Sequence, residues 1–180
     1  MTDFSASNWD KLALATGKVT LVWSAIHGWI EIMFSHFSEM PVEKAEAIFF
    51  EIRNDRTQRA MVMKLIKRSA HKRQDLIDEL EKLFDRIDRQ SKQRNSATHL
   101  LWQRIQWSEN KENDRAHTMI RSPHPLRTAS WERDISDEII AQMRDLAKNL
   151  EETEALVLDL WQRLLEHSLE ERIAKAKDQK

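Results

Sequence analysis

The sequence predicts a mainly α-helical fold, and three observations support this prediction. Only two glycines and three prolines occur in 180 residues, which leaves few residues suited to tight turns. Apolar residues recur every three or four positions over most of the chain, as in helices with one buried face. Hydrophobic residues make up 41% of the chain, which is enough for one core. We therefore expect a single domain over residues 1–180, built as a bundle of about five helices.

The first three predicted helices follow one another closely. The first helix spans about residues 7–38 and has a regular apolar stripe. This stripe consists of Leu12, Ala15, Val19, Val22, Ile26, Trp29, Met33 and Phe37. Pro41 suits the first position of a second helix, PVEKAEAIFFEI. Asp55 and Gln58 have the spacing of a capping box, so we expect Asp55 to begin a third helix.

A fourth helix is predicted over about residues 73–93, followed by a change of rhythm. The segments QRIQWS and AHTMIR alternate polar and apolar residues, with ENKEND between them. This pattern predicts a small β-hairpin insertion over about 103–121. A long last helix is predicted over about 134–175, because apolar residues repeat there in heptads. The heptad positions are Ile139, Met143, Leu146, Leu150, Thr153, Val157, Leu160 and Leu164.

Charge is distributed unevenly along the chain. Residues 53–73 contain eight basic side chains and one acidic side chain, a net charge of +7. Residues 132–172 contain twelve acids and five bases, a net charge of −7. The basic residues that we expect to face outward from the third helix, and to contact RNA, are Arg56, Arg59, Lys64 and Lys67. The alternative is that the opposite charges pair within the bundle or in a dimer.

Several classes of protein are disfavoured by the composition. Cysteine is absent, which excludes disulfides and thiolate metal sites. The apolar run over 19–34 is too short for a membrane span and contains His27 and Glu31. These two side chains lie one helical turn apart, but a pair on the edge of a helix is more often solvated than metal-binding. We expect no metal and no membrane contact. The polar N-terminal residues contain no secretory leader, so we expect a cytoplasmic protein.

The segment SKQRNSATHLLW, residues 91–102, contains the residues best suited to catalysis. RNA is cleaved without a metal when its own 2′-hydroxyl attacks the adjacent phosphate. Histidine changes its charge near neutral pH and is suited to move the proton, while arginine binds phosphate oxygens bidentately. Arg94 and His99 supply these groups, and repulsion from Arg94 favours the neutral form of His99. The spacing alone is weak evidence, since about two such Arg–His pairs are expected by chance in this composition.

The same segment resembles the signature of the HEPN superfamily. That signature is Arg, a polar residue that is often Asn, three to five further residues and then His, in a small helical bundle. RNSATH matches it with Arg94, Asn95 and His99, and Trp102 matches a subset with tryptophan a few positions later. AIFFEIRNDRTQRAMVMKLI also resembles the helix pair that precedes the motif in uncharacterised bacterial members. One residue departs from the pattern: Leu100 stands where a small residue is usual, which reduces the room for RNA beside His99.

The resemblance implies a HEPN-like protein that binds or cleaves RNA, as a metal-independent endoribonuclease without a cofactor. His99 is then the acid or base, Arg94 anchors the phosphate, and Asn95 orients the imidazole or binds phosphate. Such sites usually form between two motifs at a homodimer interface, and the long last helix is compatible with pairing. Proteins of this superfamily often act as toxins or in phage defence. The expected partners are therefore RNA, a second copy of the chain, and an antitoxin or other protein.

Two alternatives remain open. Asn95 suits the C-terminal end of a helix and Ser96 suits the start of the next, so the motif residues could simply satisfy backbone groups at a break between helices. Many members of the superfamily are thought not to cleave RNA. The alternative function is therefore a non-catalytic helical module of unassigned role that binds RNA, a nucleotide or a protein partner.

Overall fold

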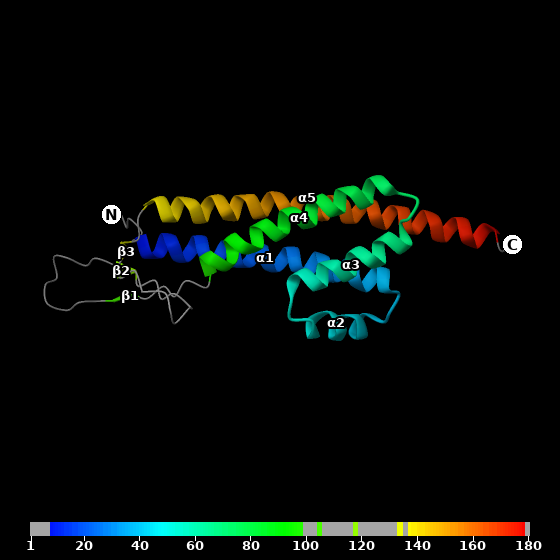
Figure 1. Ribbon diagram of the computed structural model, residues 1–180, viewed down its shortest axis with the longest axis horizontal. Helices are drawn as coiled ribbons and strands as arrows, with labels where there is room; N and C mark the ends of the chain where they lie inside the picture. The colour runs from blue at the N-terminus through cyan, green and yellow to red at the C-terminus, as the bar shows by residue number, and fades with distance from the viewer. Residues whose placement is uncertain (1–7, 99–103, 106–116, 119–132, 135–136, 179–180) are drawn as a thin grey trace, which may run out of the picture. The chain divides into compact units, whose positions relative to one another are not determined.

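The computed structural model describes residues 8–98, 104–105, 117–118, 133–134 and 137–178. These residues are mainly α-helical, and their five helices are drawn in Figure 1. The helices are α1 (Asn8–Ser38), α2 (Val42–Glu51), α3 (Asp55–Ser69), α4 (Gln74–Thr98) and α5 (Asp137–Asp178). The mainly α-helical fold class with about five helices is therefore confirmed.

The chain divides into two compact units. The first unit comprises residues 1–22 and 90–150, and the second comprises residues 23–89 and 151–180. The boundaries fall inside α1, α4 and α5, so each of these helices contributes residues to both units. The single domain that we predicted over 1–180 stays a prediction.

The first unit has a core made by α1 and α5. Its buried apolar side chains are Leu12, Ala15, Val19, Val22, Ile140, Met143, Leu146, Ala147 and Leu150. These residues keep the three- and four-residue spacing predicted from the sequence. Gln90 of α4 is also buried, and its side-chain amide donates a hydrogen bond to the carbonyl oxygen of Asn149 at 3.0 Å. This bond gives a buried polar group the partner it needs.

The first unit also contains three very short strands. They are β1 (Arg104–Ile105), β2 (His117–Thr118) and β3 (Arg133–Asp134), and they pair antiparallel in the order β1-β2-β3. A hairpin of the predicted extent over 103–121 is not seen, because the remaining residues of that range lie outside the described ones. The last helix begins at Asp137 rather than near residue 134, since Asp134 belongs to β3.

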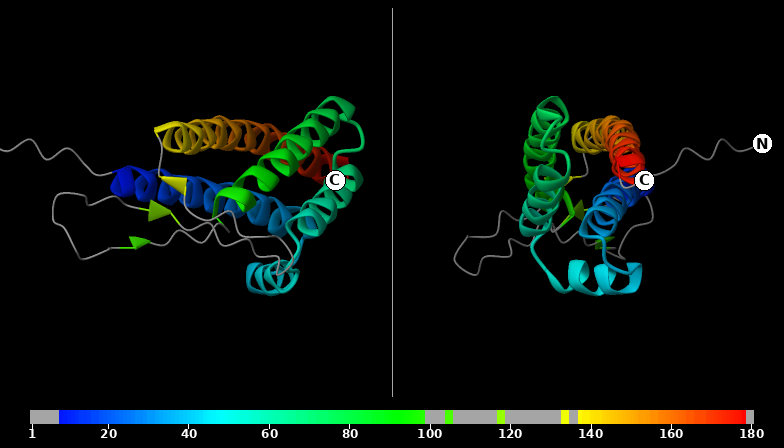
Figure 2. Two further views of the ribbon diagram at one scale, coloured as in Figure 1. Left: turned by 60° about the vertical axis from the view of Figure 1, so that its left-hand side comes forward. Right: turned by 90° about the vertical axis from the view of Figure 1, so that its right-hand side faces the viewer.

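The second unit is organised around α2 and α3. Phe49 of α2 is completely buried, and its ring centroid lies 5.5 Å from that of Phe34 in α1. Gln58 of α3 is also buried, and its amide donates hydrogen bonds of 2.9 Å to the carbonyl oxygens of Phe49 and Ile52. These bonds satisfy carbonyls where α2 ends, so they hold the turn between α2 and α3. Figure 2 shows the short α2 joined to α1 and α3 by brief connections.

The heptad seam of α5 is buried within the chain. Seven of the eight predicted seam residues are buried, and Ile139 is partly exposed. Beyond Leu164, the last buried seam residue, Leu169 and Ile173 are 48% and 56% exposed. The seam therefore supports the fold of one chain, and contact between two subunits through α5 stays a prediction.

Two helix starts differ from the sequence prediction. Asn54, not Asp55, is the N-cap of α3, and its side chain accepts a hydrogen bond of 3.0 Å from the backbone N–H of Thr57. The prediction of a capping box is therefore wrong. The side chain of Gln58 points inward and donates its hydrogen bonds to carbonyl oxygens at the end of α2. Pro41 was predicted to be the first residue of the second helix, but it is the N-cap of α2, which begins at Val42. The carbonyl oxygen of Pro41 accepts hydrogen bonds from the backbone N–H groups of Lys44 and Ala45.

The cap of α3 predicts the effect of a substitution. Replacing Asn54 by Ala removes the acceptor for the Thr57 N–H, so the free energy of unfolding should fall by about 1 kcal/mol in urea denaturation. Replacing Asn54 by Asp keeps an acceptor and should leave stability within about 0.5 kcal/mol. An equal loss in the Asn54→Ala and Asn54→Asp variants would show that the cap does not stabilise the helix through this bond.

Candidate functional site

The Arg-Asn motif lies inside α4, close to its end. The helix continues to Thr98, five residues past its predicted end. Arg94 is half-buried with its Nε atom buried, whereas Asn95 is exposed. His99, Leu100 and Trp102, the other residues of the predicted site, lie outside the described residues.

The extension of α4 changes the interpretation of the motif. Asn95 and Ser96 were suited to capping only if one helix ended there and another began. Both residues have helical backbone, so the predicted break between them is wrong. Asparagine has a weaker preference for helix interiors than most residues, because its side chain competes for backbone hydrogen bonds. Capping therefore does not account for Asn95.

The basic surface predicted on α3 is smaller than expected. Arg59 is only 4% exposed, and its guanidinium hydrogen-bonds the carboxylate of Asp88 on α4. The prediction that Arg59 faces outward is wrong. Arg59 precedes the buried Val62 and Ile66 by three and seven residues, so it lies on the inner face of α3. A cation in that position cannot contact RNA without leaving the core.

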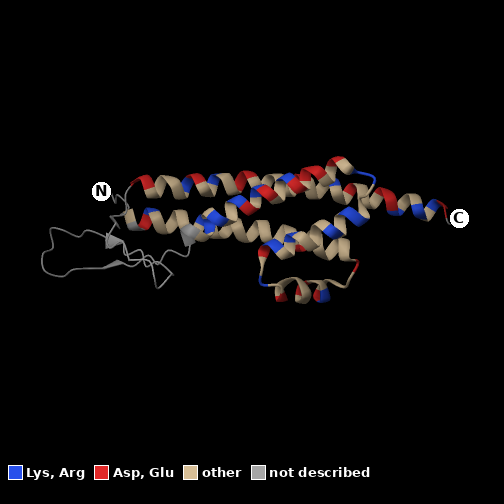
Figure 3. Cartoon of the chain, viewed as in Figure 1, with Lys and Arg blue, Asp and Glu red and all other residues tan. Residues whose placement is uncertain are grey.

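The other three predicted RNA-binding residues are exposed. Arg56 Nε lies 3.6 Å from a carboxylate oxygen of Asp88, and Lys67 is ion-paired with Glu81 at 2.5 Å. The side chain of Lys64 makes no hydrogen bond or ion pair with the described residues. Figure 3 shows basic residues along α3 and residues of both signs on α4. Much of the positive charge of α3 is therefore already paired within the second unit.

The pair His27 and Glu31 makes separate contacts. His27 Nε2 lies 3.4 Å from a carboxylate oxygen of Asp55, and its ring packs against Trp23. Partial burial, with repulsion from Glu46, raises the pKa of Glu31. In the described part of the chain, no group of three or more His, Cys, Asp or Glu side chains is placed to hold a metal ion.

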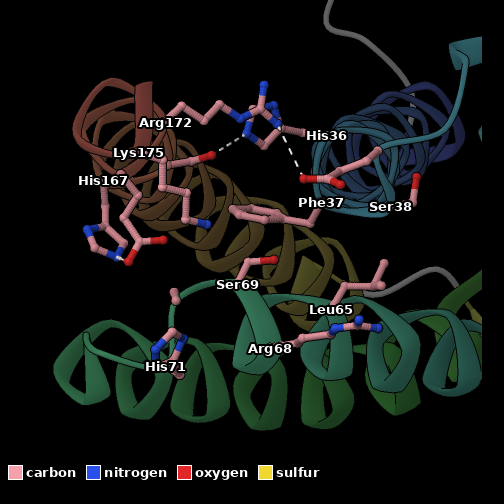
Figure 4. A pocket seen from close by; sticks show the side chains of 14 residues that line it. His36, Phe37, Ser38, Leu65, Arg68, Ser69, His71, His167, Arg172 and Lys175 are labelled. Carbon is pink, nitrogen blue, oxygen red and sulfur yellow. Dashed lines mark hydrogen bonds and ion pairs between the residues drawn. The ribbon is translucent and has the colours of Figure 1, made fainter. Parts of the chain in front are cut away.

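A cavity of about 340 Å³ in the second unit was not predicted from the sequence. It lies where the C-terminal end of α1, the C-terminal end of α3 and the last third of α5 meet, as Figure 4 shows. Three of its lining residues are histidines, namely His36, His71 and His167. They are far apart in the sequence and form no local motif. The only local signal is the basic residues at the ends of α3 and α5.

Interactions within this cavity involve mainly imidazole rings. His36 Nε2 lies 3.1 Å from the hydroxyl oxygen of Ser168, and its ring packs edge-on against Phe37 and Trp161. Partial burial lowers the pKa of His36, and repulsion from Arg172 lowers it further. His167 Nε2 is buried without a hydrogen bond, and the nearest carboxylate, that of Glu171, is 3.8 Å away. The cavity is therefore polar, and its lining includes the hydrogen-bonded imidazole of His36 and the imidazole of His167, whose Nε2 is buried.

The two pairs between α3 and α4 predict different costs of mutation. Replacing Asp88 by Asn leaves the buried Arg59 charge without its carboxylate, so unfolding free energy should fall by about 2 kcal/mol. Replacing Glu81 by Gln breaks the exposed pair with Lys67 and should cost less than about 0.5 kcal/mol. Urea denaturation measures both, with the exposed Asp85→Asn variant of α4 as the control. Equal costs for Asp88→Asn and Glu81→Gln would contradict the structural role of Arg59.

Comparison with known proteins does not assign the chain to a family. The chain matches no protein-family model, no curated protein and no solved structure. No helix among the described residues has the length and apolar character required to span a membrane.

Proposed function

We propose that this chain is a HEPN-like protein that binds RNA at the C-terminal end of α4 and cleaves it without a metal. The proposal is supported by one observation above all. Arg94 and Asn95 lie within α4 at a position where capping does not require them, and Asn95 is exposed. His99 follows the last residue of that helix by one position. The three residue types are those that the cleavage needs.

The proposed reaction is an internal transfer at phosphorus. The 2′-oxygen of the RNA attacks the adjacent phosphorus, a bond between them forms, and the bond to the 5′-oxygen of the next nucleotide breaks. His99 of one motif accepts the proton of the 2′-hydroxyl, and His99 of the second copy's motif donates a proton to the leaving 5′-oxygen. Arg94 binds the non-bridging phosphate oxygens, where negative charge builds up in the transition state. The products are a 2′,3′-cyclic phosphate and a free 5′-hydroxyl, so water is not a reactant.

The partial burial of Arg94 fits an anchoring role. An arginine whose stem is packed loses less conformational entropy on binding than a fully exposed one. Asn95 is adjacent and exposed, so it can contact either the imidazole or a phosphate oxygen. A second copy of the chain, bringing a second motif to the same cleft, is part of the proposal. It rests on the resemblance described above.

A non-catalytic binding module is the second candidate function. It is favoured by the paired state of α3, because Arg56, Arg59 and Lys67 already have carboxylate partners. A polyanion must compete with these carboxylates for the same cations. The protein then retains fewer contacts for an extended RNA than the +7 charge of residues 53–73 indicates.

Cleavage is tested with purified protein and mixed RNA in EDTA. The unmodified chain should produce 2′,3′-cyclic phosphate ends, and His99→Ala should lower the rate by at least about 100-fold, since acid–base catalysis contributes that much. The exposed Arg89→Gln variant of α4 is the control and should cleave at the normal rate. Intact RNA with the unmodified chain would exclude the ribonuclease and leave the binding module.

RNA binding is tested separately, with the His99→Ala variant. Affinity for single-stranded RNA should fall steeply with salt, and Arg94→Gln should reduce the slope of log affinity against log salt by roughly 0.7, the value for one phosphate contact. Fluorescence anisotropy at several salt concentrations gives both slopes. The same slope with and without Arg94 would remove Arg94 from the RNA contact, and a flat response would indicate that RNA is not bound through phosphates.

A further inference from the structure

The cavity between the ends of α1, α3 and α5 has the character of an anion site. We propose that it binds the terminal phosphate of a small phosphorylated molecule. The proposal concerns residues other than the Arg-Asn motif and does not rest on RNA binding. Figure 4 shows side chains from all three helices around one space, with Arg172 beside His36 on one side and His71 on another.

The charged side chains of the cavity leave positive charge available. Its cations are Arg68, Arg172 and Lys175, and its carboxylates are Glu39 and Glu171, which gives a net charge of +1 with neutral histidines. The carboxylates bind their partners only loosely. Arg172 lies 3.9 Å from Glu39, and Glu171 lies 3.9 Å from Lys72, a residue outside the cavity lining.

Two of the three cations have no competing partner. The side chains of Arg68 and Lys175 make no hydrogen bond or ion pair with the described residues. Arg68 is on the last turn of α3 and Lys175 is near the end of α5, so two different helices supply them. A planar guanidinium and a compact ammonium are the two groups that bind phosphate oxygens best in proteins. Bringing them to one cavity favours a dianion as the ligand.

One of the three histidines, His36, makes the positive charge of the cavity dependent on pH. All three face the cavity, with His36 from α1, His71 from the turn after α3 and His167 from α5. Protonation of His36 would raise the net charge of the lining from +1 to +2. His36 resists protonation in the empty cavity, because burial and Arg172 lower its pKa. An anion beside it favours the protonated form, so anion binding and proton uptake at His36 should be coupled.

Helix dipoles oppose an anion and sharpen this dependence. The C-terminal ends of α1 and α3 border the cavity, and each carries a partial charge of about −0.5. Together these nearly cancel the net charge of +1 that the lining has with neutral histidines. Strong binding of a dianion therefore requires the protonated form of His36, and the cavity should bind anions better at about pH 6 than at about pH 8.

The size of the cavity limits the ligand. A volume of about 340 Å³ is at the small end of the range for small-molecule sites. It admits a phosphate group with one small organic moiety, but not a folded polymer. The ligand class is therefore a small phosphate monoester, with inorganic phosphate as its simplest form.

Calorimetric titration of the full chain tests the proposal. Inorganic phosphate and adenosine 5′-monophosphate should bind at about pH 6, whereas adenosine, which lacks the phosphate, should not. Sulfate stays a dianion over this range, so it reports the protein's protonation alone. Its affinity should fall at least about tenfold between pH 6 and pH 8. Arg68→Gln and Lys175→Gln should each weaken phosphate binding about tenfold, with Arg53→Gln and Lys177→Gln as exposed controls.

Weaker phosphate binding in these variants could also result from loss of the fold, so a variant that binds phosphate more tightly is tested as well. Replacing Glu39 by Gln removes the carboxylate beside Arg172 and should strengthen phosphate binding by about threefold or more. Absence of phosphate binding by the folded chain at millimolar concentration would overturn the proposal. The proposal would also be overturned if the phosphate affinity were unchanged in the Arg68→Gln, Lys175→Gln and Glu39→Gln variants. Sulfate affinity that is independent of pH would overturn it as well.

Discussion

The ion pair between Arg59 and Asp88 is the contact on which the arrangement of the second unit depends. Arg59 is only 4% exposed and must stay with the carboxylate of Asp88, because leaving its buried positive charge alone is costly. The pair fixes the face that α3 turns toward α4 and buries Val62 and Ile66. The same orientation brings Arg68, at the end of α3, to the lining of the phosphate cavity. The buried charge of Arg59 therefore serves the packing of α3 and not its exposed surface.

The long helices could be predicted because their apolar spacing extends over many turns. The stripe from Leu12 to Phe37 and the seam from Met143 to Leu164 are buried almost residue for residue. The helix ends were harder to predict, because caps depend on single residues. Asn54 and Asp55 are both residue types that cap helices well. The structure identifies Asn54 as the cap, because its side chain accepts the hydrogen bond from the backbone N–H of Thr57. The end of α4 was missed because Asn and Ser are more frequent at helix ends than in helix interiors, whereas here both lie within the helix.

The candidate sites were predictable only where they are local in sequence. The motif of Arg94 and Asn95 could be found because its members are adjacent. Arg59 was misplaced because it was assigned by charge, although its spacing to Val62 and Ile66 indicated the inner face. The phosphate cavity could not be found from the sequence, since His36, His71 and His167 are brought together only by the packing of α1, α3 and α5. Sequence patterns report periodicity within an element, not which ends of different elements meet.

We infer that the paired cations of α3, Arg56, Arg59 and Lys67, serve the fold, that Arg68 serves the cavity, and that RNA binds at the end of α4 instead. The most direct test is the affinity for single-stranded RNA of a chain with Arg56→Gln, Lys64→Gln and Lys67→Gln together. Affinity should stay within about twofold of the unmodified chain, with an unchanged salt slope. A fall of about tenfold or more, with a slope reduced by roughly two, would show that the exposed face of α3 is itself the RNA-binding surface.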